Sequence, residues 1–168
     1  SLYLTGDIAV GIFFLPGANG SWQQDQIDES FAIITGALEL FTEDEPNANI
    51  TFTFINEAGR QPPGTYTQIR DYINNLRNVY NTHWAYAIFV YNDAARSHAL
   101  YWGPYHTLHR GDLRQGRVAR HETSHIFGAY DQYVENPGAT SPSPKVEGGY
   151  LSVCNANTQA NSGNGYFA

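Results

Sequence analysis

The segment HWAYAIFVYND at residues 83–93 limits the fold of this chain more than any other. It is almost continuously apolar and rich in residues that favour β-strands. A strand with two apolar faces must be covered on both sides, which is typical of parallel sheets with helices on both faces. We therefore predict that residues 83–93 form the central strand of such a sheet.

Two further strands are indicated before this one. DIAVGIFFLPG at residues 7–17 predicts a buried strand that ends at Pro-Gly. NITFTFINE at residues 49–57 alternates, which places Ile50, Phe52 and Phe54 on one face of a strand.

Helical periodicity separates the predicted strands. Ser21 is a candidate N-cap of the first helix, with Gln24 completing a capping box. The apolar residues of this helix recur at intervals of three or four, at Ile27, Phe31, Ile34, Leu38 and Phe41. The second helix is marked by Ile69, Ile73, Leu76 and Tyr80. The resulting order β-α-β-α-β favours a largely parallel sheet.

The remainder of the chain is less regular. Residues 97–112 resemble a strand interrupted by Gly103-Pro104, which suits an edge strand or a bulged segment. Residues 113–128 predict a third helix that ends at Gly128. Residues 129–168 are rich in Pro, Ser, Asn and Gly, so we expect irregular structure there.

Composition excludes several classes of function. The chain has 168 residues, enough for one domain, and a net charge of -7 that disfavours nucleic acids and anionic membranes as partners. No apolar run approaches the ~20 residues of a membrane span. The acidic turn at 42–49 lacks the spacing of a calcium loop. The lone Cys154 excludes a disulfide within the chain.

HETSH at residues 121–125 contains candidate metal ligands and a candidate catalytic base. His121 and His125 are four residues apart, so on a helix both imidazoles project from one face and can reach one metal ion. Glu122 is rotated away from direct ligation but is close enough to hold a water on the metal. Gly128 permits a sharp turn that would bring Asp131 back as a third ligand. Three protein ligands leave a fourth position open, as in catalytic zinc sites.

The extended pattern HETSHIFGAYD resembles that of the metzincin zinc peptidases, and its Asp in the third ligand position is similar to the snapalysin-type branch. The resemblance implies one zinc ion held by His121, His125 and Asp131, with Glu122 as the catalytic base. It also implies a single catalytic domain over residues 1–168, divided into an α/β subdomain (1–128) and a short irregular C-terminal subdomain (129–168). The fold class expected is thus α/β (α+β), with a mixed, mostly parallel, twisted sheet and three helices.

Two positions depart from the family pattern. Ser124 stands where close relatives usually have Gly, and its small side chain should do little harm. Metzincins place a Met-containing turn beneath the metal, yet this chain contains no Met. We expect either that the C-terminal part is truncated or that another residue supports the site.

The predicted function is a secreted, monomeric zinc endopeptidase that acts on proteins or peptides. The strand at 98–109 could align an extended substrate, and His106 and His109 are candidate substrate contacts or else exposed polar positions on that edge. Two alternatives stay open: a non-catalytic zinc-containing module that binds protein or glycan, and a zinc amidase acting on cell-wall peptides. Candidates for assistance to the oxyanion are Tyr130, Tyr133, Tyr150 and Tyr166.

Overall fold

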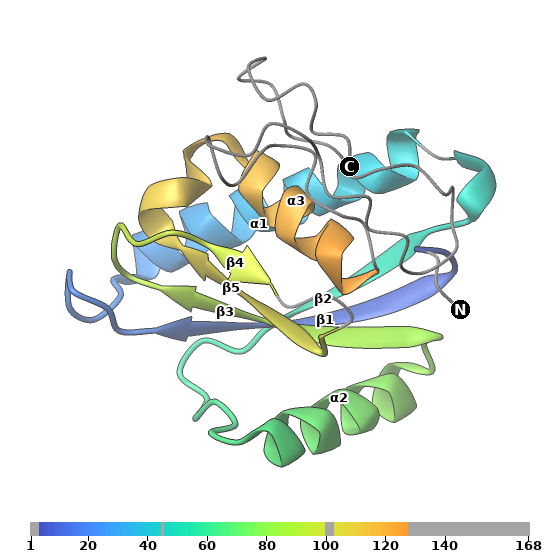
Figure 1. Cartoon of the computed structure of the whole chain (residues 1–168), viewed down its shortest axis with the longest axis horizontal. Helices are drawn as coiled ribbons and strands as arrows, with labels where there is room; N and C mark the ends of the chain where they lie inside the picture. Colours follow the sequence, from blue (N-terminus) through green and yellow to red (C-terminus); the bar gives the residue numbers. More distant parts are fainter. Residues whose placement is uncertain (1–3, 45, 100–102, 128–168) are drawn as a thin grey trace, which may run out of the picture.

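The computed structural model describes residues 4–44, 46–99 and 103–127 (Figure 1). The predicted order β-α-β-α-β is confirmed, and a pair of short strands and a third helix follow it. The elements are β1 (Asp7–Leu15), α1 (Gln24–Asp44), η1 (Pro46–Ala48), β2 (Thr51–Asn56), α2 (Tyr66–Tyr80), β3 (Trp84–Tyr91), β4 (His98–Ala99), β5 (Tyr105–His109), η2 (Arg110–Gln115) and α3 (Arg117–Ile126). The segment 129–168, predicted to be irregular, lies outside the described residues.

The strands form one sheet in the order β2-β1-β3-β5-β4. β1 pairs in parallel with β2 and β3, β3 pairs in parallel with β5, and β4 runs antiparallel to β5. The predicted central strand is confirmed, because β3 lies between β1 and β5 and its residues 86–90 are buried. The mixed, mostly parallel sheet with three helices is therefore confirmed as the fold class.

Helices cover both faces of the sheet. Figure 1 shows α2 on one face and α1 with α3 on the other. Successive side chains of a strand point to opposite faces, so each central strand contributes to two cores. The core under α1 and α3 includes Ile8, Val10, Ile12, Ile34, Leu38, Tyr86, Ile88 and Leu108. The core under α2 includes Ala9, Phe13, Ile69, Tyr72, Ile73, Leu76 and Phe89.

The predicted apolar stripes of α1 and α2 are largely correct. The stripe of α1 is buried except for Phe31, which is half-buried against the core. In α2, Ile69, Ile73 and Leu76 are buried, whereas the exposed fraction of Tyr80 is 43%. Tyr80 is the last residue of the helix, before Asn81 turns the chain with φ 51°. Tyr72 is buried instead, one turn before Leu76 on the same stripe.

The predicted N-cap at Ser21 is wrong, because α1 begins three residues later at Gln24. The carbonyl of Ser21 accepts a hydrogen bond from Asn92 Nδ2 at 3.2 Å. The Trp22 indole N–H donates to the Leu15 carbonyl at 2.6 Å. These contacts hold residues 21 and 22 against the ends of β3 and β1, so the helix begins only after them. Local sequence favours a cap that the tertiary contacts override.

The segment 97–112 is not one edge strand. It forms the hairpin-like pair β4 and β5, in which His98 lies opposite Thr107. β5 is an interior strand between β3 and β4, and only the two residues of β4 form the described edge on this side. The break at Gly103-Pro104 therefore separates two strands and does not distort a single one.

The third helix is shorter than predicted. α3 begins at Arg117, and the residues before Gly116 form the 3-10 helix η2. Gly116 has φ 66°, a left-handed conformation that favours glycine. A Cβ there would lie 3.1 Å from the Cβ of Ala37 in α1. Gly116 thus ends η2 and lets α3 begin in a new direction close to α1. The predicted end at Gly128 lies outside the described residues.

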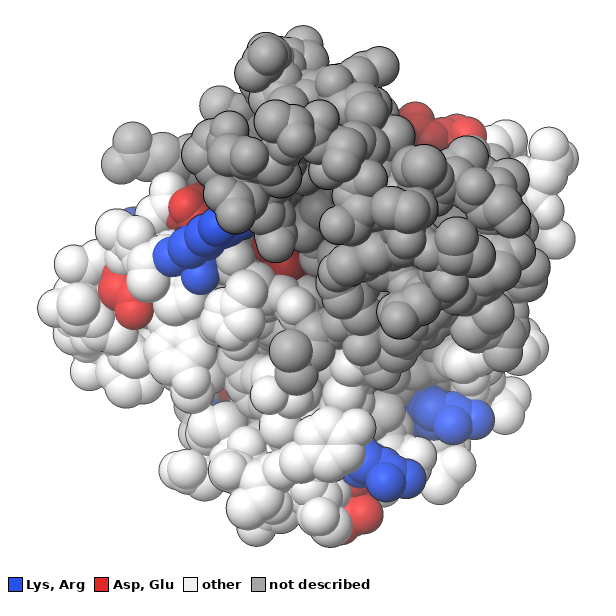
Figure 2. Space-filling model, viewed as in Figure 1, with Lys and Arg blue, Asp and Glu red and all other residues white. Residues whose placement is uncertain are grey.

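Charged side chains are scattered on the described surface. On the face seen in Figure 2, blue and red groups are scattered over the described part, and some lie next to each other. Among the helices of the described ranges, none combines the length and the apolar character needed to cross a bilayer.

Gly11 provides a test of the packing under α2. A Cβ at Gly11 would lie 1.8 Å from the Tyr72 hydroxyl, which donates a 2.9 Å hydrogen bond to Glu57 Oε1. Gly11→Ala should therefore lower the free energy of unfolding by roughly 2–4 kcal/mol, through overpacking and the loss of this buried bond. Urea denaturation measures the change.

Gly36→Ala is the matched control, because a Cβ at this exposed position of α1 meets nothing within 4 Å. It should raise the free energy of unfolding by about 0.5–1 kcal/mol, since alanine favours the helix. Equal stability of Gly11→Ala and the wild type would contradict the packing described here.

Candidate metal centre

α3 carries the HETSH sequence and packs against α1, β4 and β5. All residues from 121 to 125 are buried, although every one of them is polar. An amphipathic surface helix would expose such residues on one side. Burying them is costly unless they find partners. This turn of α3 is therefore the part of the described chain where a polar function is most strongly indicated.

His121 and His125 lie close together on one face of α3. Their Nε2 atoms are 3.1 Å apart, and their ring planes meet at 79° with the centroids 4.5 Å apart. Two nitrogens that each bind zinc at ~2.0–2.1 Å in tetrahedral geometry are ~3.3 Å apart. The two imidazoles therefore fit two ligand positions of one zinc ion.

The other predicted members of the site are only partly described. Glu122 is buried beside His121 on α3. Asp131, Gly128, Cys154 and the candidate tyrosines lie outside the described residues. Within the described ranges, no three His, Cys, Asp or Glu side chains form a group able to hold a metal. The third ligand stays a prediction for Asp131.

Ser124 lies on α3 between Thr123 and His125. Its hydroxyl donates to the Arg120 carbonyl one turn earlier at 3.0 Å. The side chain thus turns back onto its own helix.

His106 is neither exposed nor on the sheet edge, contrary to the sequence-based expectation. It lies on the interior strand β5 with an exposed fraction of 1%. Its Nε2 lies 3.0 Å from Thr123 Oγ1, and the Tyr86 hydroxyl lies 3.0 Å from the same oxygen. Burial, together with the nearby charges of His125 and His98, lowers the pKa of His106 to about 3. His106 is therefore neutral at physiological pH.

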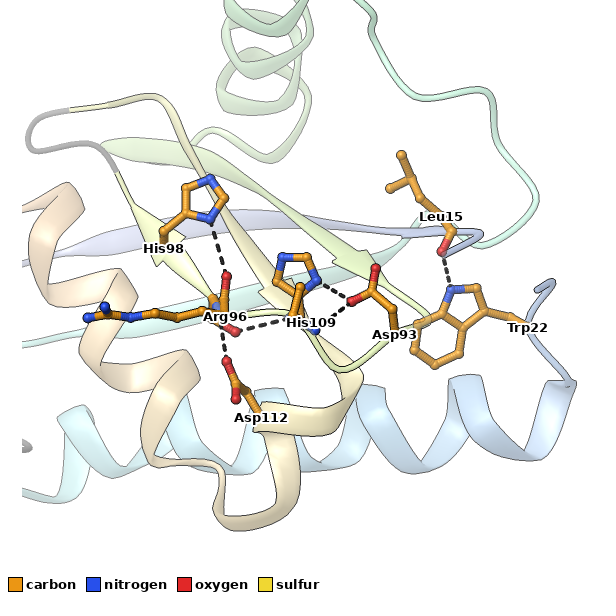
Figure 3. Close-up of polar contacts among 9 residues, drawn as sticks. Leu15, Trp22, Asp93, Arg96, His98, His109 and Asp112 are labelled. Atoms are coloured by element: carbon orange, nitrogen blue, oxygen red, sulfur yellow. Dashed lines mark hydrogen bonds and ion pairs between the residues drawn. The ribbon is translucent and has the colours of Figure 1, made fainter. Parts of the chain in front are cut away.

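His109 is also buried, and its expected place on the edge is likewise wrong. Figure 3 shows it between His98 and Asp93, at the end of β5. Its Nδ1 forms a hydrogen bond with Asp93 Oδ1, and its backbone N–H donates to Ser97 Oγ at 3.0 Å. The Ser97 backbone N–H in turn donates to Asp112 Oδ2 at 2.7 Å. These hydrogen bonds connect the loop after β3 to His109 at the end of β5 and to Asp112 in η2.

Sequence reasoning did not single out Thr123, Tyr86 or Asp93. Thr123 stands at an unspecified position of the motif, and Tyr86 lies inside an apolar strand. The available signal was their polar atoms, because a buried hydroxyl in a predicted core must have a partner. Finding the partner requires the pairing of β3 with β5, which the sequence did not give.

Comparison with known proteins adds no relative: no family model matches the chain, and neither a curated protein nor a solved structure is significantly similar.

The Asp93–His109 pair predicts a dependence of stability on acid pH. The hydrogen bond from His109, aided by the Ala95 N–H, lowers the pKa of Asp93 below its ordinary value of 3.8. A depressed folded-state pKa stabilises the fold above the unfolded-state pKa, and this contribution is lost as pH falls through the folded-state value. Asp93→Asn should therefore reduce Tm at pH 7.

The difference in Tm between wild type and Asp93→Asn should shrink as pH falls below the unfolded-state pKa of about 4 and through the lower folded-state pKa, because Asp93 of the wild type then becomes protonated and as neutral as asparagine. Thermal unfolding followed by circular dichroism from pH 7 to pH 3 should show the two curves converging. A constant difference in Tm over this range would contradict the assignment.

Proposed function

We propose that this chain is a zinc-dependent endopeptidase that hydrolyses peptide bonds within proteins or peptides. The observation that carries the proposal is the pair of buried histidines with Nε2 atoms 3.1 Å apart, separated in sequence by a buried glutamate. Two imidazoles aimed at one point are the expected donors for zinc. A carboxylate beside an open metal position supplies a base.

The residues proposed to hold zinc are His121, His125 and Asp131. Zinc, when bound, polarises the scissile carbonyl and lowers the pKa of a water molecule toward ~7. The buried surroundings of the histidine pair limit access of bulk water, which strengthens electrostatic interactions in the site. Neutral imidazoles and one carboxylate form a donor set that matches catalytic zinc.

Glu122 is proposed to move the proton. Its carboxylate accepts a proton from the attacking water and passes it to the leaving amine, which a peptide needs because an amide anion is a poor leaving group. The side chain follows the first proposed ligand directly, so α3 carries both functions on adjacent residues. A purely structural zinc site has no need for this carboxylate.

The resemblance to metzincins agrees with this proposal. The mostly parallel sheet precedes a helix that carries the HExxH pattern, as that family requires. Alignment of an extended substrate by β-addition now falls to β4, because β5 is an interior strand. Secretion remains part of the proposal on composition alone, and a monomeric state is proposed with it.

Zinc binding is the first test. Wild-type protein should bind one zinc ion per chain, measured by atomic emission after gel filtration. His121→Ala should lose the ion, because it removes one of the two converging nitrogens. His83→Ala is the control, since the His83 side chain is 67% exposed at the start of β3. Equal zinc content in wild type and His121→Ala would place the metal elsewhere.

Hydrolysis is the second test. Zinc-loaded wild type should cleave unfolded fluorescent casein, and Glu122→Gln should reduce kcat by ~10²–10⁴-fold while one zinc stays bound. Glu39→Gln, at an exposed position of α1, should cleave like the wild type. Removal of zinc with a chelator should abolish cleavage, and added zinc should restore it.

The remaining outcomes separate the alternatives. Bound zinc without cleavage of casein by the wild type would favour a binding module. Cleavage of cell-wall peptides with no action on casein would favour an amidase. Cleavage by Glu122→Gln at the wild-type rate would exclude the proposed base.

A further inference from the structure

Thr123 lies midway between the two histidines in sequence but faces the other way. Residues two positions apart in the sequence are rotated by about 200° around the helix axis. Thr123 therefore projects from the side of α3 opposite His121 and His125. Its exposed fraction is 0%. The histidine face of α3 thus has a buried polar side chain directly behind it.

Thr123 is held by two strands of the sheet. Its Oγ1 lies 3.0 Å from the Tyr86 hydroxyl of β3 and 3.0 Å from His106 Nε2 of β5. A hydroxyl has one proton, so Thr123 donates to at most one of these groups and the other must donate to it. The two contacts are therefore different hydrogen bonds and together define one orientation of the side chain.

The partners of Thr123 are themselves fixed. Tyr86 and His106 are fully buried on neighbouring strands, with ring centroids 5.7 Å apart. Tyr86 also contacts Phe127, just after α3, edge to face at 6.1 Å between centroids. The rings are set by the pairing of β3 with β5, so they provide a rigid reference for the rotation of α3.

The polar character of this cluster is not explained by stability alone. His106 Nδ1 is buried and has no hydrogen-bond partner among the described residues. An apolar set of similar volume would fill the same space without leaving a polar atom unpaired. Unlike a methyl group, the Thr123 hydroxyl forms directional hydrogen bonds, which fix the orientation of the side chain.

We propose that Thr123, held by Tyr86 and His106, is a positioning residue that fixes the rotation of α3 and so directs the pair of His121 and His125, which the helix keeps together, relative to the rest of the proposed zinc site. The inference rests on the proposed zinc site. An Nε2 atom lies roughly 6 Å from the helix axis, so a rotation of about 10° moves it by about 1 Å. Zinc ligation tolerates only about ±0.2 Å. Because both nitrogens move together, a rotation of α3 displaces the pair from any ligand that α3 does not carry, and so it changes metal affinity.

Three variants test the inference in the metal-free and metal-loaded full chain. Thr123→Val keeps the volume and removes both hydrogen bonds. Thr123→Ser keeps the hydroxyl and removes a methyl group. Ile73→Val is the control for general destabilisation, because Ile73 is buried under α2 on the other face of the sheet. Zinc affinity is measured by competition with a chromophoric chelator, and coordination by the visible spectrum of the cobalt-substituted protein.

We expect Thr123→Val to bind zinc ~10–100-fold more weakly and to change the cobalt spectrum. Thr123→Ser should stay close to the wild type in both measurements. Ile73→Val should lower Tm without changing either. Should Thr123→Val fail to fold, Tyr86→Phe removes one of the two bonds and should weaken zinc binding in the same direction.

Wild-type affinity and spectrum in Thr123→Val, or in Tyr86→Phe where that variant is needed, would overturn the positioning role while leaving the zinc site intact. An equal loss of affinity in Ile73→Val would also overturn it, because affinity would then follow stability. Absence of zinc binding in the wild type would instead overturn the proposed function, and this inference with it.

Discussion

The rest of the structure depends on the burial of one polar turn of α3. Its side chains lie where a globular protein normally places apolar groups, so each needs a partner. The partners come from different directions. Ser124 bonds to its own helix, Thr123 bonds to the sheet, and the two histidines converge on each other. The sheet and the histidine pair therefore lie on opposite sides of the same turn of α3, which connects them.

β5 connects this turn to a second polar cluster. His106 and His109 are three residues apart on β5, so they point to opposite faces of the sheet. His106 faces α3, whereas His109 bonds to Asp93 at the end of β3. One short interior strand thus fixes both the helix behind the histidine pair and the loop that ends the central strand. Both roles require β5 to lie inside the sheet.

Much of the fold could be predicted because its signals are local or periodic. The apolar run of β3 and the stripe of α1 predicted buried elements correctly, since burial on both faces and helical repeats leave a direct mark on composition. The failures share a cause. The start of α1 after Ser21, the turn at Gly116 and the interior place of β5 depend on contacts between segments far apart in the chain. A local pattern contains no information on such contacts.

The sequence by itself determined that His121 and His125 come together, because four residues make about one helical turn wherever the helix lies. It also determined the alternation of strands and helices, through the spacing of apolar residues. Only the tertiary structure decided which way that helix turn faces, because its orientation is set by Tyr86 and His106 on strands that pair far apart in sequence. The four-residue spacing brings the two histidines together, and the contacts of Thr123 with the sheet set the direction in which the pair points.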